Sequence, residues 1–204
     1  MIQRKTLATM LSYLLSPTVF AFYIIVIFVL FPPLTSTQNN TIFVFLLAFL
    51  FLCVFPVIAI LYSFKKGHID IWVSNQRQRT PFYLVAITGY IIASFIFYLQ
   101  NETIFFVLTL AYLGVTTSVT LGNYFTKISS HSAGVAGPLA ALSFVYGFIS
   151  LPLFILLPLV YWARLNLNAH TKLQLTLGMI IGLLVTYSIF YVFLPEIFAF
   201  RNIV

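Results

Sequence analysis

Charged side chains are scarce in this chain, since only 6% of its 204 residues are Asp, Glu, Lys or Arg. A soluble domain of this size carries about a quarter. Acidic residues are the rarest, and the three are Asp70, Glu102 and Glu196. Catalysis by metal ions held between carboxylates is therefore excluded. The sequence also lacks the ligand spacing of a metal site and a glycine-rich nucleotide loop, so we expect no metal and no cofactor.

Cysteine and long polar segments are almost absent as well. The single cysteine, Cys53, lies in an apolar run, so no internal disulfide can form and we expect a small buried side chain. No internal repeat, low-complexity tract or long linker interrupts the chain. This absence of breaks predicts a single integral membrane domain over residues 1–204.

Apolar residues make up 62% of the chain, and its mean hydropathy is +1.08. A helix needs about 20 apolar residues to cross the core of a bilayer. Stretches of this kind occupy 6–30, 41–63, 82–99, 103–125 and 173–194. They predict an all-α polytopic transmembrane helical bundle of about six to seven spans, a multi-pass protein that we expect in a bacterial inner membrane. The start resembles a signal peptide, but no small-residue cleavage site follows, which indicates an uncleaved first span.

The stretch 132–161 allows two interpretations. As one helix it would be about 45 Å long, which is too long for a single crossing without strong tilt. Gly147, Ser150 and Pro152 offer a turn in its middle. We favour two short helices joined there, which brings the count to seven spans, give or take one.

Most of the positive charge falls on one membrane face when the predicted spans are counted. The segments 65–81, 127–131 and 164–172 share this face with the N-terminus. Nine of the ten basic residues lie there: Arg4, Lys5, Lys65, Lys66, Arg77, Arg79, Lys127, Arg164 and Lys172. The positive-inside rule favours the cytoplasm for this face, although a phosphate site would gather the same cations. The tenth basic residue, Arg201, falls on the opposite face.

All three histidines, His68, His131 and His170, also lie on the basic face. His170 and Gln174 are four residues apart, so a helix that begins near His170 would place them one turn apart on one side. The side-chain oxygen of Gln174 could then hold the imidazole. Arg164 stands six positions before His170, at the mouth of the apolar bundle.

Two further polar clusters lie at predicted helix starts on the same face. Ser129-Ser130-His131 leads into a run of small residues, and free backbone N–H groups at a helix start bind anions. Arg77 and Arg79 form a basic pair just before Pro81, which begins a helix. The three clusters together suit the binding of a phosphoryl group carried by a lipid.

These clusters resemble the three motifs of the type 2 phosphatidic acid phosphatase superfamily, which is membrane-embedded and independent of metals. Its third motif is Ser-Arg, five residues, His, three residues and Asp, and Ala163-Arg164, His170 and Gln174 follow that spacing. Its second, Pro-Ser-Gly-His, is similar to Ile128-Ser129-Ser130-His131. Its first, a Lys followed after six residues by Arg-Pro, is matched weakly by Arg77-Gln78-Arg79-Thr80-Pro81. The motifs keep the family's order, and the resemblance covers about 65–182 as a phosphatase-like core, with two extra spans before it.

The resemblance implies a mechanism. His170 would attack phosphorus and carry it as a phosphohistidine, oriented by Gln174. His131 would protonate the leaving oxygen and then activate water. The phosphate would lie among guanidinium groups, with Arg77 or Arg79 joining Arg164, and among the groups at the helix start. The implied phosphate-binding residues are Arg164, Arg77, Arg79, Ser129 and Ser130.

The chain departs from the family pattern at several positions. Gln174 replaces an Asp, so the imidazolium that forms on His170 would lack its counter-charge. Ala163 replaces Ser, and Ser130 replaces Gly. If Arg79 is the arginine of the first motif, the motif's Lys falls seven positions earlier, where this chain has Trp72. The alternative is therefore a catalytically impaired relative that binds or moves phospholipid through the same cationic pocket. A multispan scaffold without a ligand is a third and weaker hypothesis.

The expected function is that of a metal-independent lipid phosphate phosphatase or phosphotransferase. Its substrate could be phosphatidic acid, a phosphatidylglycerol phosphate or a polyprenyl (di)phosphate, and the choice stays open, as does the oligomeric state. The basic residues that give the chain its net charge of +7 lie between apolar spans. The expected partners are therefore membrane lipids and a lipid phosphate, and no nucleic acid.

Other basic and small residues have plainer interpretations. His68 is expected to be an interfacial polar residue, and Lys127 and Lys172 are expected to reach lipid headgroups. Gly178 and Gly182 form a Gly-x-x-x-Gly step, which is typical of helix packing in membranes.

Overall fold

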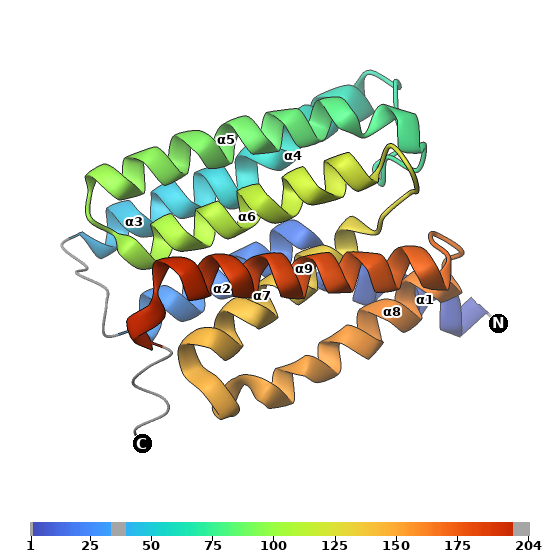
Figure 1. Cartoon of the computed structure of the whole chain (residues 1–204). Helices are drawn as coiled ribbons and strands as arrows, with labels where there is room; N and C mark the ends of the chain where they lie inside the picture. Colours follow the sequence, from blue (N-terminus) through green and yellow to red (C-terminus); the bar gives the residue numbers. More distant parts are fainter. Residues whose placement is uncertain (1, 34–39, 198–204) are drawn as a thin grey trace.

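The computed structural model describes residues 2–33 and 40–197, and every regular element in these ranges is helical (Figure 1). The elements, in chain order, are α1 (Ile2–Leu14), α2 (Pro17–Leu30), α3 (Thr41–Ala48), the π-helical η1 (Phe49–Val54), α4 (Phe55–Lys65), the 3₁₀ turn η2 (Gln76–Gln78), α5 (Thr80–Leu99), α6 (Thr103–Gly122), α7 (Ser130–Tyr146), the 3₁₀ segment η3 (Gly147–Ile155), α8 (Leu156–Asn166) and α9 (Lys172–Phe193). The predicted all-α fold is confirmed.

Five helical stretches are long and apolar enough to cross a membrane, or six if α1 and α2 count as one bent span. The multi-pass prediction is thus supported, and the upper count of six meets the lower end of the predicted six to seven spans. The stretch 130–166 contains two helices, as favoured above, because α7 ends before Gly147, whose φ of +68° suits glycine. Figure 1 shows the chain turning there. Helix α8 has 11 residues and directly continues η3, and the two together lead from this corner back to the end of the bundle where α7 begins (Figure 1).

The first predicted span, 6–30, is wrong as a single helix. Helices α1 and α2 meet at an angle of 49°. Pro17 begins α2 and Ser16 is its N-cap. A proline has no N–H to bond to the preceding turn, and its ring clashes with that turn, so the helix bends at this position.

The second span is continuous from Thr41 to Lys65, close to the predicted 41–63. The side chain of Asn40 caps its start by accepting a hydrogen bond from Phe43 N at 3.1 Å. The π-helical turn η1 interrupts it shortly before Pro56. The irregular turn η1 directly precedes α4.

Helices α7 and α9 form the most extensive helix pair, and the Gly-x-x-x-Gly step lies between them. A Cβ atom on Gly178 would come within 2.5 Å of Ser129 O, and one on Gly182 within 2.6 Å of Ala133 O. Only glycine permits this close approach of the two backbones. The packing interpretation of the two glycines is confirmed.

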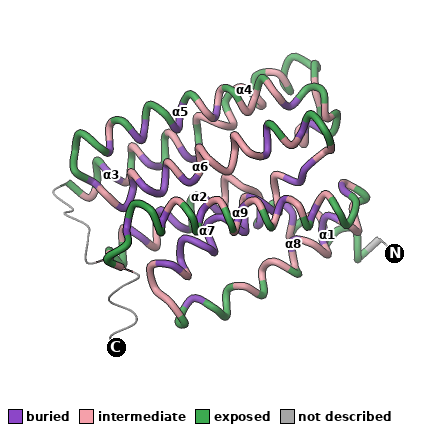
Figure 2. The backbone as a smooth tube through the Cα atoms, in the orientation of Figure 1, coloured by how far each residue is buried: buried purple, intermediate pink, exposed green. Residues whose placement is uncertain are grey.

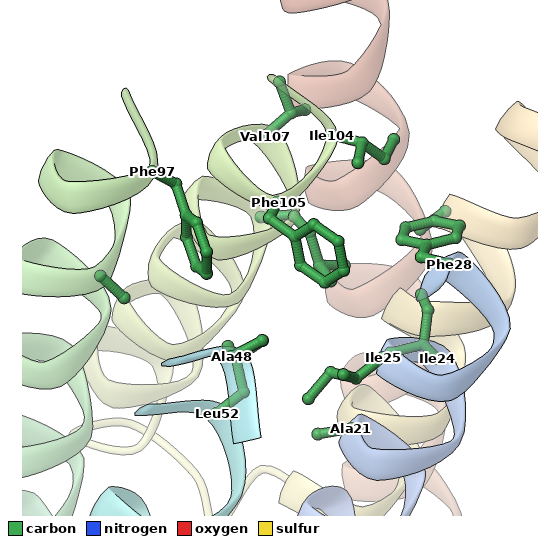
Figure 3. Close-up of a cluster of buried hydrophobic side chains, with 14 of the residues drawn as sticks. Ala21, Ile24, Ile25, Phe28, Ala48, Leu52, Phe97, Ile104, Phe105 and Val107 are labelled. Atoms are coloured by element: carbon green, nitrogen blue, oxygen red, sulfur yellow. The ribbon is translucent and has the colours of Figure 1, made fainter. Parts of the chain in front are cut away.

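Large apolar side chains from α2, η1, α5 and α6 form the main core. Figure 3 shows the ring of Phe105 between Phe28 of α2 and Phe97 of α5. All three rings are fully buried. Figure 2 shows exposed residues along the outer sides of the helices, and many of them are large and apolar, as expected of a surface that meets lipid.

Three loops lie together at one end of the bundle, with the N-terminus: 66–79, 123–129 and 167–171 (Figure 1). We call it the cationic end, and the other end, with the α5–α6 turn and the Gly147 corner, the apolar end. The predicted sharing of one face by these loops is confirmed. Arg201, predicted opposite, lies outside the described residues.

Candidate functional site

A cavity of about 480 Å³ extends from the cationic end into the bundle. An apolar shaft forms most of it, between α2, α4, α5, α6 and α7. The polar side chains at its cationic end are Trp72, Arg79, Tyr83, Ser130, His131, Arg164 and His170. No carboxylate is among the described residues that line it. The cavity therefore offers positive charge at one end and an apolar lining beyond it.

His170 lies just before the N-cap of α9 and is 8% exposed. Its Nδ1 is 3.2 Å from the backbone oxygen of Lys127 and 3.3 Å from Oε1 of Gln174. Because both neighbours are acceptors, the proton of the neutral ring belongs on Nδ1, and Nε2 keeps its lone pair. The contact between Gln174 and His170 is the one that the four-residue spacing predicts.

Gln174 is held by the start of its own helix. Its Oε1 accepts a hydrogen bond from Thr171 N at 3.1 Å, and its own N–H donates to Thr171 Oγ1 at 3.3 Å, which together form a capping box. Its Nε2 donates to Thr126 Oγ1 at 3.5 Å. The side chain that orients His170 is therefore held by two neighbours, Thr171 and Thr126.

Burial, together with the positive charges of Arg79, Arg164 and Lys127, lowers the pKa of His170 from 6.5 to about 3. The hydrogen bond with Gln174 acts in the opposite direction. At neutral pH the imidazole is uncharged, which is the form that can act as a nucleophile.

Lys127 belongs to the loop between α6 and α7 and does not reach for headgroups as predicted. Its Nζ donates to the backbone oxygen of Ala169 at 3.1 Å, because the lysine stem lies across the loop before α9. Burial, followed by the charges of Arg79 and Arg164, lowers the pKa of its ammonium below the usual 10.5. The lysine thus joins two loops and adds a third positive charge beside His170.

His131 and Arg164 each present a nitrogen without a partner. Among the described residues, Nε2 of His131 and Nε of Arg164 are buried and make no hydrogen bond. Arg164 Nη1 donates to Ser12 Oγ at 2.6 Å, and its guanidinium lies 5.3 Å from the ring centre of Trp72. The same ring is 5.5 Å from that of His131. Since buried polar atoms nearly always have a partner, these two nitrogens indicate a ligand or water in the cavity.

Arg79 and Arg77, alternatives in the sequence, are separated by the structure. Arg79 is buried and lines the cavity, where Nε donates to Val73 O at 2.9 Å and Nη1 to Ile128 O at 3.2 Å. Arg77 belongs to η2, is exposed and lies outside the cavity lining. The expectation that Arg77 contributes is not supported, because the helical turn at 76–79 points only the second arginine inward.

The loop before Arg79 is held by Asp70. Its carboxylate accepts hydrogen bonds from Trp72 N at 2.9 Å and Ser74 N at 2.8 Å. Burial alone would raise the pKa of Asp70, but these bonds with Ser74 and Trp72 lower it overall. Between them Val73 has a φ of +46°, which is strained for a β-branched residue. The strained turn aims Val73 O at Arg79 and places Trp72 in the cavity.

The two serines before His131 have different roles. Ser129 is fully buried, and its hydroxyl accepts a hydrogen bond from Ser132 N at 3.3 Å as the N-cap of α7. It does not line the cavity, so its side chain is a helix cap rather than a phosphate ligand. Ser130 does line it, with its hydroxyl oxygen 2.7 Å from that of Tyr83.

Sequence reasoning missed Tyr83, Trp72 as a cavity residue, and Ser12. Tyr83 could have been found, because it follows Arg79 by four residues and so lies one turn along the same face of α5. Ser12 could not, because 152 positions separate it from Arg164 and no local pattern joins them.

The residues around the cavity can bind an anion and transfer a group. Two guanidinium groups can take the anion, a neutral imidazole with a free lone pair can attack it, and a second imidazole can exchange protons. His68 and Lys172 are exposed and lie outside the lining. No protein-family model, curated protein or solved structure matches the chain.

Proposed function

We propose that this protein is a membrane-embedded, metal-independent lipid phosphate phosphatase or phosphotransferase that acts through a phosphohistidine on His170. One observation carries the proposal: a cavity with a cationic, carboxylate-free end and an apolar shaft contains an imidazole whose Nδ1 faces two acceptors. The resemblance to the type 2 phosphatidic acid phosphatases agrees with this chemistry.

In the proposed first step, Nε2 of His170 bonds to phosphorus while the bond from phosphorus to the lipid oxygen breaks. His131 enters this step as the imidazolium, donates its proton to that oxygen and becomes neutral as the lipid alcohol leaves. Arg79 and Arg164 neutralise the phosphoryl oxygens, where negative charge is stabilised in the transition state.

In the second step, His131 takes a proton from water, or from an acceptor hydroxyl in a transfer reaction. The oxygen attacks phosphorus as the bond to His170 breaks, which releases phosphate or the new ester and restores the neutral imidazole. Lys127 O and Oε1 of Gln174 hold Nδ1–H in both steps.

A catalytically impaired, lipid-binding relative is the second candidate, and Gln174 favours it. Gln174 is neutral, and its Oε1 is shared with Thr171 N. An imidazolium on His170 would therefore have no carboxylate to stabilise it among three positive charges. The same cavity would then bind the lipid phosphate without turning it over.

The decisive experiment measures phosphate release by the purified protein in detergent from phosphatidic acid, phosphatidylglycerol phosphate and a polyprenyl diphosphate. We expect release from one of them, inhibition by vanadate, and a loss of at least about 10³-fold in the H170A variant. The matched control is H68A, whose histidine is exposed on the same end. Wild-type turnover in H170A would exclude the phosphohistidine, and activity that arises only in Gln174→Asp would favour the impaired relative.

A further inference from the structure

The cavity is about as deep as one leaflet of a bilayer. Along α6 its lining runs from Val119 at the cationic end to Leu108. These residues are 11 positions apart in one helix, a rise of about 16 Å, whereas the hydrocarbon core of a bilayer is about 30 Å thick. A ligand whose charged group lies at Arg79 and Arg164 would therefore extend an apolar part to the middle of the membrane.

Most walls of the shaft are closed by direct packing. Helices α2 and α7 touch where a Cβ on Gly134 would come within 2.7 Å of Pro17 Cβ. Helices α4 and α5 touch where a Cβ on Gly89 would come within 2.6 Å of the Phe55 ring. Deeper in the bundle, α2 packs against η1 through Ala21 and its neighbours (Figure 3). Between α2 and α4, by contrast, contacts are few in the described residues.

The wall between α2 and α4 is the weak one. The start of α2 (Pro17, Thr18, Val19) and the inner side of α4 (Pro56, Val57, Ile60) both line the cavity. Yet α4 packs against α5 and η1, and its contacts with α1 and α2 are sparse in the described residues. Not one side chain of α4 is buried. A helix whose cavity-lining side chains are only half-buried separates that cavity from lipid with a single layer of side chains.

The backbone of the second span is irregular beside this wall. η1 is π-helical, and Pro56 follows it without an N–H for the preceding turn. On the other side, the bend of 49° at Ser16 turns α1 away from the axis of α2. Since Phe55 fixes the deep end of α4 on α5, the end toward Lys65 is the part that can yield.

We infer that the substrate enters sideways from the membrane, with its chain passing between α2 and α4 while its phosphate moves to Arg79 and Arg164. We call the two edges, 17–19 and 56–60, the lateral portal. The inference rests on the proposed function and specifies its substrate: a lipid of the leaflet at the cationic end, not a soluble phosphate ester. The cationic end supplies the charge complementarity, and the depth of the shaft matches one lipid chain.

The test narrows the portal with one side chain. Val57 lines the cavity, whereas Ile58 is 56% exposed on the outer side of α4 and is the matched control. We expect Val57→Trp to lower kcat/KM for long-chain phosphatidic acid at least about tenfold more than for p-nitrophenyl phosphate, which has no chain. Ile58→Trp should leave both values within about twofold of the wild type. Equal losses on the two substrates in Val57→Trp would overturn the portal, as would unchanged values for both.

A second measurement keeps the portal testable if the protein releases no phosphate at all, which would refute the proposed function alone. Phosphatidic acid with a photoreactive group in its chain is bound to the wild type in bicelles, irradiated and mapped by mass spectrometry. Cross-links to Val19, Val57 and Ile60 support lateral entry. Cross-links confined to outward residues of α4, such as Ile58 and Leu61, contradict it.

Discussion

The two ends of the bundle are packed differently, although one buried carboxylate, Glu102, lies at the apolar end. At the apolar end, Phe105 lies between Phe28 and Phe97, with ring centroids 6.3 Å and 5.5 Å apart, which are favourable edge-on and tilted contacts. At the cationic end, buried His131 and Arg164 keep nitrogens without partners. Groups left incomplete in this way cost stability and are found where a ligand completes them. The fold is stabilised at one end and prepared for binding at the other.

The largest expected effect on stability is at the apolar end. Phe105→Ala removes a fully buried ring and should destabilise the protein by up to about 3 kcal/mol. This is the low end of the range in water, since the unfolded helices of a membrane protein remain in lipid. Phosphate release per folded molecule should not change. The loss of stability is measured by unfolding in mixed micelles. Leu121→Ala is the control, because Leu121 is 60% exposed. A fall in the specific activity of Phe105→Ala would contradict the separation of the two ends.

At the cationic end the strongest contrast is between two arginines of one loop. Arg79→Leu should lower kcat/KM by about 10²-fold, as the loss of one group that stabilises a transition-state oxyanion does. Arg77→Leu should stay within about twofold, because Arg77 is exposed outside the cavity. Equal effects of the two substitutions would mean that the loop charge acts only at long range.

The comparison also explains what the sequence could predict. The apolar runs predicted the helices. Because successive spans cross in opposite directions, every second loop lies on the same face, and this count brought His131, His170 and Arg164 together. The bend before Pro17 was readable too, since proline breaks the turn before it, but the apolar run over 6–30 masked it.

What the sequence could not decide depends on side-chain direction and on distant contacts. Arg77 and Arg79 differ in sequence only by two positions, and the turn set by Asp70 and strained Val73 decides which one faces inward. The packing of α2 against η1, and its sparse contacts with α4 in the described residues, depend on helix tilt. No residue pattern encodes such tilt.

A smaller effect is expected at Gln174, where the charge can be added without breaking the helix cap. Glutamate at this position of a capping box also accepts the N-cap hydrogen bond. Gln174→Glu should therefore keep α9 intact, raise the pKa of His170 and raise turnover about tenfold by stabilising the imidazolium. A turnover increase without a pKa increase, read from ¹⁵N-histidine NMR, would show that Gln174 does not act through His170.

The smallest expected effect is the acid dependence of stability. The pKa of His170 is lowered in the folded protein from 6.5 to about 3. Between these values the unfolded chain binds a proton that the folded protein does not, so stability should fall as pH decreases from about 6.5 toward about 3. Lys127→Met removes one positive neighbour, raises the pKa of His170 and weakens this loss. Exposed Lys65→Met should leave it unchanged. The test is the free energy of unfolding measured across this pH range, with H170N as the reference. If this free energy depends on pH equally in H170N and the wild type, the acid dependence belongs to other groups at the cationic end.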